Sequence, residues 1–197
     1  MTSSNQSAPR LWPANHLQPN RSAGHTLIEL LVAFSFLVIG AFAFLRVMVS
    51  ASNASNVNFE VALAKEGARS QIEWMMSLDY KEAFARFNSS AADDPPAPLV
   101  SPGANFAVQG LDPVPGDADG FVGEIIFPNL PAAATQIRED LVNTSLGSPM
   151  DLNGDQVIDS ADHLADCLAI PVLVRITWQG RSGRCVSQFK TILGAMQ

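Results

Sequence analysis

The sequence lacks the residue groupings that most enzymes need. Its three histidines, at positions 16, 25 and 163, do not cluster. It has no nucleophile elbow, phosphate-binding loop, zinc-ligand spacing or pair of catalytic acids that rises above chance. Its two cysteines, Cys167 and Cys185, permit at most one internal disulfide. We therefore expect no enzymatic activity.

Basic residues are scarce and dispersed. The chain has 12 lysines and arginines against 19 acidic residues, a net charge of −7. Arg10 and Arg21 precede Gly24 in a stretch without acid, so the remainder carries 10 basic and 19 acidic residues, a net charge of −9. A nucleic-acid partner requires clustered lysine and arginine, so we exclude one. The length of 197 residues favours one domain with an extension.

Proline is absent from His25 through Asp94, which permits a long uninterrupted helix. Residues 27–49 are almost wholly apolar, with Glu29 near the start and Arg46 near the end as the only charges. A helix needs about 20 apolar residues to span a bilayer, and this block with its flanks provides them. The sequence therefore predicts a membrane helix over 25–50, preceded by a disordered cytoplasmic leader over 1–24.

A secretory signal peptide is the alternative interpretation of this block, because it also places positive charge before an apolar core. Its cleavage motif would follow the core, where Ser50-Ala51-Ser52 is a weak match. Glu29 argues against this alternative. An isolated charge inside an apolar block costs several kcal/mol and is rarely kept without a partner.

The run from Gly24 to Ala33, Gly-His-Thr-Leu-Ile-Glu-Leu-Leu-Val-Ala, resembles the processing signal of type IV prepilins and type II secretion pseudopilins. The resemblance implies that a prepilin peptidase cuts between Gly24 and His25, so the apolar helix stays in the mature protein. It also implies methylation of the new amine at His25. The family typically begins its mature chain with Phe, and His25 departs from that pattern.

The same resemblance gives Glu29 a partner. In pilin-like filaments this carboxylate pairs with the N-terminal amine of a neighbouring subunit. Desolvation removes water as a competitor for either charge, so their mutual neutralisation favours the correct register during assembly. The alternative is a carboxylate that only snorkels to the headgroup boundary.

Beyond the membrane, residues 51–87 predict an amphipathic continuation of the same helix. Apolar residues recur there at spacings of three and four and make one stripe, which we expect to pack against a small sheet. The stripe consists of Val57, Val61, Ala64, Ala68, Ile72 and Met75.

The rest of the chain, 88–197, predicts a β-rich head. A loop over 88–103 precedes two strand candidates, at 105–109 and 121–127. Two further β-rich runs, 172–178 and 185–192, flank a glycine-bearing turn and predict a hairpin. The predicted fold class is therefore α+β, a long helix packed on a small antiparallel sheet. Pilins share this plan.

The loop 151–162, Asp-Leu-Asn-Gly-Asp-Gln-Val-Ile-Asp-Ser-Ala-Asp, has the sharpest chemical pattern. Its oxygen-bearing side chains follow the spacing that wraps a calcium ion in a twelve-residue loop. The pattern resembles the calcium loops of EF-hand and dockerin repeats. The predicted ligands are five side chains and one backbone carbonyl, which belong to Asp151, Asn153, Asp155, Asp159, Asp162 and, through its carbonyl, Val157.

Two residues depart from the calcium-loop pattern. Gln156 replaces the glycine that supplies a positive φ, and Asp162 replaces a longer glutamate. We expect Ile158 to point into the core and a short helix to follow over 161–168. Because one such loop is present, the expected role of calcium is structural. The alternative is an acidic surface loop without a metal.

Cys167 and Cys185 are the candidate disulfide. An oxidising compartment and the C-terminal disulfide common in pilins favour the bridge. The predicted hairpin opposes it, because a turn at 180–183 places Cys185 near Trp178 and leaves Cys167 beyond the far end of that strand. A disulfide needs the two Cα atoms about 5.5 Å apart.

These features predict a minor pilin, a structural subunit of a type IV pilus-like filament that crosses the inner membrane once before assembly. The expected partners are the prepilin peptidase, other pilin subunits through helix–helix contacts, and the inner membrane. The head would lie in the periplasm or at the cell surface.

One alternative is a type II secretion pseudopilin. The other is a membrane-tethered binding module whose head recognises a ligand and never polymerises.

Overall fold

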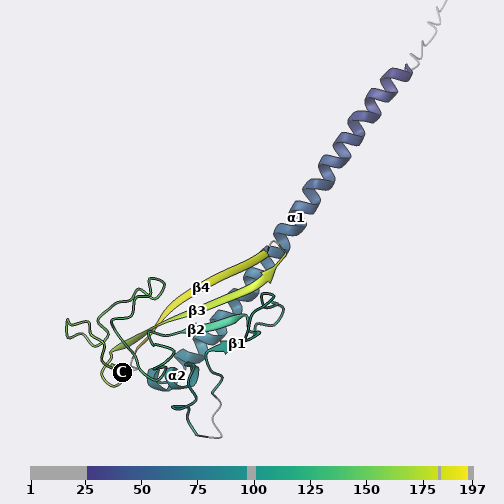
Figure 1. The fold of residues 1–197 in the computed structure, drawn as a ribbon. Helices are drawn as coiled ribbons and strands as arrows, with labels where there is room; N and C mark the ends of the chain where they lie inside the picture. Colours follow the sequence, from purple (N-terminus) through teal and green to yellow (C-terminus); the bar gives the residue numbers. More distant parts are fainter. Residues whose placement is uncertain (1–25, 97–100, 182, 195–197) are drawn as a thin grey trace, which may run out of the picture. The chain divides into compact units, whose positions relative to one another are not determined.

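The structure, a computed structural model, describes residues 26–96, 101–181 and 183–194. The chain divides into two compact units, one ending at Val47 and the other beginning at Met48. Within the described residues, two helices come first and four strands follow (Figure 1).

The first helix, α1, spans Leu27–Met76. Thr26 caps its start, because the Thr26 Oγ1 accepts the N–H of Glu29 at 3.4 Å and its carbonyl accepts the N–H of Leu30 at 3.2 Å. The helix is long and apolar enough to cross a membrane, and none of its most apolar stretch is buried within the structure. The predicted long apolar helix is therefore confirmed.

The helical region that follows is divided, whereas the prediction for 51–87 was a single helix. α1 ends at Met76, and a second helix, α2, spans Tyr80–Phe87. Asp79 lies between them with an extended backbone, and its side chain accepts the N–H of Lys81 at 3.0 Å. Asp79 thus caps a new helix. An aspartate cap interrupts the helix without any proline or glycine, which is why the prediction missed the break.

The head contains a single antiparallel sheet in the order β1-β2-β3-β4 within the described residues. β1 spans Asn105–Phe106, β2 spans Gly123–Ile126, β3 spans Ala169–Gly180 and β4 spans Gly183–Gly194. β3 and β4 are the predicted hairpin, extended at both ends. The antiparallel sheet beside a long helix confirms the α+β class.

The predicted apolar stripe of α1 faces the core of the head over most of its length. Ala64, Ala68 and Met75 are buried, and Ile72 packs against them at the edge of the core. Val61 is 43% exposed and does not belong to the buried stripe. The side chains of β3 that face the same core are Ile170, Val172, Val174, Ile176 and Trp178.

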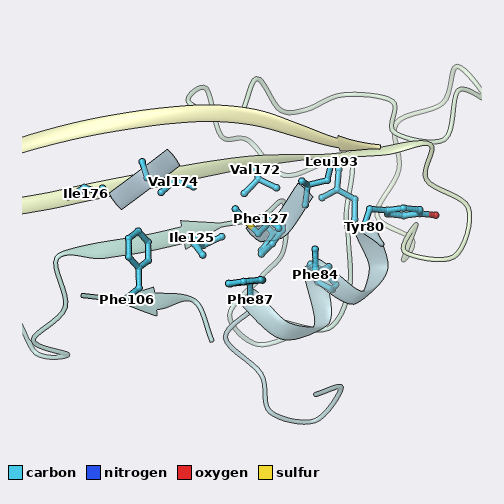
Figure 2. Close-up of a cluster of buried hydrophobic side chains, with 14 of the residues drawn as sticks. Tyr80, Phe84, Phe87, Phe106, Ile125, Phe127, Val172, Val174, Ile176 and Leu193 are labelled. Carbon is cyan, nitrogen blue, oxygen red and sulfur yellow. The ribbon is translucent and has the colours of Figure 1, made fainter. Parts of the chain in front are cut away.

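Aromatic side chains fill the space between α2 and the sheet (Figure 2). Phe84 of α2 meets Phe127 edge to face, with ring centroids 5.0 Å apart. Phe87 meets Trp74 of α1 in the same way, also at 5.0 Å. Such pairs add about 0.5–1.5 kcal/mol beyond the burial of their area. The short second helix is therefore part of the core.

Gly67 lets a loop approach α1 closely. A Cβ at this position would lie 2.7 Å from Cγ2 of Val108, closer than real Cβ atoms approach. Val108 is buried, and its β-branched side chain has little rotamer freedom. Absence of a side chain at Gly67 is thus what allows Val108 to join the core.

Candidate functional site

The start of α1 holds the first predicted site. Glu29 lies in the first turn and is exposed. An acid in this position also interacts favourably with the positive end of the helix dipole. Gly24 and His25, the predicted cleavage pair, lie outside the described residues. The described geometry leaves the Glu29 carboxylate accessible to a partner group.

The first half of loop 151–162 is a tight turn built around Asp151. Its Oδ1 accepts the N–H of Gly154 at 2.6 Å, and its Oδ2 accepts the N–H of Gln156 at 2.8 Å. Backbone hydrogen bonds, that of Gln156 first, hold the pKa of Asp151 below its usual value. Gln156 has a φ of 70°, the positive value that the calcium-loop pattern predicts at this position.

Asn153 and Asp155 continue this turn. The Asn153 Oδ1 accepts the N–H of Asp155 at 3.0 Å, and the Asp155 Oδ1 accepts the N–H of Val157 at 2.7 Å. The side-chain amide of Asn153 also donates to Oδ2 of Asp155 at 3.2 Å. Three of the predicted ligands, including Asp151, are therefore brought into one turn.

The second half of the loop engages its acids elsewhere. Oδ1 of Asp159 lies 3.1 Å from Nε2 of His163. Oδ1 of Asp162 accepts the N–H groups of Ile137 and Leu164 at 3.0 and 3.1 Å. Asp162 therefore ties the loop to a distant segment of the head.

Two predictions about the surroundings of the loop are wrong. Ile158 does not enter the core, since it is 48% exposed, and Val157 beside it is exposed as well. Residues 161–168 form a single turn instead of a helix, closed by the N–H of Cys167 and the carbonyl of His163 at 2.8 Å. The buried side chain beside the loop is instead that of His163, which is 5% exposed.

Glu139 and His163 form a buried polar pair beside the loop that sequence reasoning missed. Glu139 is fully buried, and its Oε1 accepts the N–H groups of Leu152 and Asn153 at 2.6 and 3.2 Å. Its Oε2 has no hydrogen-bond partner among the described residues and lies 3.8 Å from Nε2 of His163. A buried carboxylate requires compensation, and His163 is placed to supply it.

Several acids act on His163 at once. Burial alone would lower the pKa of His163. The hydrogen bond with Asp159 and the negative charges of Glu139 and Asp166 have the opposite and larger effect, so the net pKa is raised. Oδ1 of Asp166 lies 3.3 Å from Nδ1 of the ring. The spacing of Asp159 and Asp166 around His163 is a local signal that could have predicted this cluster. Glu139 lies far upstream and leaves no such signal.

Loop 151–162 gathers its oxygen-bearing side chains only in its first half. Calcium takes about six to eight oxygen ligands, most of them from such a loop. In the part of the chain that the structure describes, no three His, Cys, Asp or Glu side chains lie close enough to hold a metal ion together. An ion held by the whole loop would have to share Asp159 with His163 and Asp162 with the backbone of Ile137.

Cys167 and Cys185 are both free thiols, so the candidate disulfide is not formed. Cys185 lies opposite Trp178 across the hairpin, whereas Cys167 precedes the far end of β3. Burial raises the pKa of the Cys167 thiol to about 11. The hydroxyl of Tyr80 donates to the carbonyl of Cys167 at 3.2 Å, which fixes this segment against α2.

Two candidate sites thus lie on separate parts of the chain. One is the exposed carboxylate of Glu29 at the start of an apolar helix. The other is the oxygen-rich loop 151–162 with the Glu139 and His163 pair beside it. No protein-family model, curated protein or solved structure matches the chain.

Proposed function

We propose that the chain is a minor pilin, a structural and non-catalytic subunit of a type IV pilus-like filament that resides in the inner membrane before assembly. The observation that carries this proposal is the continuity of α1, Leu27–Met76. Its N-terminal part is apolar and unburied, and its C-terminal part packs on the sheet of the head. One helix thus supplies both a membrane or filament segment and the spine of a folded head.

The apolar side chains of the N-terminal part require a non-aqueous partner. A bilayer supplies it before assembly, and the helices of neighbouring subunits supply it afterwards. The proposed cut by the prepilin peptidase releases the amine of His25, which pairs with Glu29 of a neighbouring subunit. In a core of low dielectric this pairing neutralises both charges and sets the register of assembly.

Substitution of Glu29 tests the filament role. Glu29→Ala leaves the helix apolar, so we expect normal membrane insertion and loss of incorporation into filaments. Glu66→Ala, which removes an exposed acid farther along α1, is the matched control and leaves incorporation unchanged. If the Glu29→Ala protein keeps full function, the chain is instead a membrane-tethered binding module.

The mature N-terminus provides an independent measurement. Mass spectrometry of the native protein should find a chain that begins at His25 and carries a methylated amine. A soluble chain that begins after Val49 would exclude the proposal. A type II secretion pseudopilin would undergo the same processing, and deletion of the gene would then abolish secretion instead of surface filaments.

We also propose that loop 151–162 binds calcium as a structural ion. The turn around Asp151 and the positive φ of Gln156 support this role. Binding with the low affinity of extracellular modules, about 0.1–1 mM, should raise the melting temperature of the head, and a chelator should reverse the rise. Asp155→Asn should abolish the shift and Asp117→Asn, at an exposed turn, should not. No shift at millimolar calcium excludes the site.

A further inference from the structure

Strand β4 forms one edge of the sheet, and its outer side is unpaired (Figure 1). It pairs with β3 along all of its 12 residues in one continuous register, without a bulge. No other segment among the described residues hydrogen-bonds to it. β4 also contains no proline. A long and regular edge of this kind is a template for a further strand.

The backbone groups that point outward from β4 belong to identifiable residues. Thr177 and Gln179 of β3 donate their N–H groups to carbonyls outside β4, at 2.7 and 2.9 Å. Their register partners, Val186 and Arg184, therefore lie at non-hydrogen-bonded positions. Because such positions alternate along a strand, the outward N–H and C=O groups are those of Arg184, Val186, Gln188, Lys190 and Ile192.

The side chains of these same five residues are exposed. Val186 and Ile192 are 50% and 55% exposed, so apolar surface lies beside the free backbone groups. Arg184 and Lys190 take part in no ion pair within the described ranges. The edge therefore presents free backbone groups, apolar surface and unpaired positive charge together.

The positive charge of this edge contrasts with the rest of the chain. From Cys167 to the C-terminus the sequence has four basic residues and no Asp or Glu, whereas the rest has 8 basic and 19 acidic residues. One of the four, Arg175, is already paired with Glu124 at 3.2 Å. A positive edge on a negative molecule attracts an acidic segment and repels a basic one.

We propose that β4 is a docking edge for an extended, acidic segment of another protein, which joins the sheet as an additional strand. Main-chain hydrogen bonds to the outward groups would supply affinity, and acids opposite Arg184 and Lys190 would supply selectivity. Those two residues are separated by about 20 Å along the strand, so the partner carries its acids at the same separation. This role does not depend on filament assembly.

A second copy of β4 is disfavoured as the occupant. If the β4 strands of two copies paired edge to edge, each would bring Arg184 and Lys190 to the interface, and neither strand contains an acid. Like charges on adjacent strands destabilise the pairing. We therefore assign the edge to an acidic partner strand.

Synthetic peptides test this proposal on the full chain in detergent micelles. The probe is a short, end-blocked peptide of alternating threonine and valine, with glutamates at the spacing of Arg184 and Lys190. The first control peptide carries lysine in place of glutamate. The second is the acidic peptide with alternate backbone nitrogens methylated. We expect the acidic peptide to bind at least about tenfold more tightly than either control.

Two variants connect this binding to β4. Arg184→Glu combined with Lys190→Glu should reverse the preference between the acidic and basic peptides. Val186→Pro removes an outward N–H without removing a β3–β4 hydrogen bond, so it should weaken binding about tenfold with little change in the melting curve. Val186→Thr is the matched control and should bind normally.

Three results would overturn the proposal. The first is equal binding of all three peptides, which would indicate non-specific adsorption. The second is unchanged binding by the folded Val186→Pro variant. The third is concentration-dependent dimerisation that Val186→Pro abolishes, combined with no binding of the acidic peptide, which would assign the edge to a second copy of the chain.

Discussion

Trp178 and Glu60 join the hairpin to the long helix, because the indole Nε1–H of Trp178 donates to Oε2 of Glu60 at 3.1 Å. Trp178 lies in β3 and is 2% exposed, and Glu60 lies on α1. Gly180 permits this approach, since a Cβ there would lie 2.7 Å from the same Oε2. The contact therefore ties the second half of α1 to the hairpin.

Removal of the Glu60 acceptor should destabilise the head. Glu60→Ala leaves the buried indole N–H without its partner, which costs about 1–3 kcal/mol. Glu60→Gln keeps an acceptor oxygen and should cost less than half as much. Urea denaturation followed by circular dichroism measures both, and Glu66→Ala is the exposed control. Equal stability of Glu60→Ala and the wild type would show that the hydrogen bond contributes nothing.

Gly67→Ala should lower the stability of the head although alanine favours helices. The gain in helix propensity is about 1 kcal/mol, but the new Cβ would lie 2.7 Å from the stiff side chain of Val108, and overpacking costs about 1–3 kcal/mol. At Gly40, another glycine of α1, a Cβ meets no atom within 4 Å. Gly40→Ala should therefore leave the melting temperature of the head unchanged. A Gly67→Ala protein that melts at or above the wild-type temperature contradicts this account.

Local pattern predicted much of the fold. The apolar block, the stripe at Ala64 and Ala68, and the hairpin around the glycine-bearing turn each involve residues that are near in sequence, and all are present. The break at Asp79 was missed because aspartate stops a helix only where its side chain caps the next one. The close approach of Gly67 and Val108 depends on two distant segments and leaves no periodic signal.

The candidate loop was predictable only in part. The acids of loop 151–162 and the positive φ of Gln156 follow from spacing and loop geometry. The engagement of Asp162 with Ile137 and the burial of Glu139 depend on a segment that the loop meets only after folding. Ile158 was expected in the core, but it is 48% exposed, and His163 is the buried side chain beside the loop.

Glu139→Ala should destabilise the head more than any exposed acid. It removes the acceptor of two backbone N–H groups, those of Leu152 and Asn153, and leaves His163 without the buried charge beside it. We expect a loss of about 2–4 kcal/mol. Glu124→Ala, which breaks an exposed ion pair with Arg175, should cost less than about 1 kcal/mol. Chemical denaturation of both variants makes the comparison, and similar losses would contradict a structural role for the buried pair.

The two cysteines should differ sharply in reactivity. Cys167 is 3% exposed and its pKa is raised to about 11, so near pH 8 its thiol is protonated and shielded. Cys185 is only half-buried near the end of the hairpin. We expect iodoacetamide to modify Cys185 in the folded protein and Cys167 only after denaturation. Iodoacetamide reacts with the thiolate, and the Cys167 thiol loses its proton only near its raised pKa of about 11. Labelling of Cys167 should therefore increase only as the pH approaches that value. Mass spectrometry of tryptic peptides locates the label, and Cys167→Ser is the control. Equal labelling of both thiols, or a disulfide-linked pair of these peptides, would contradict the arrangement.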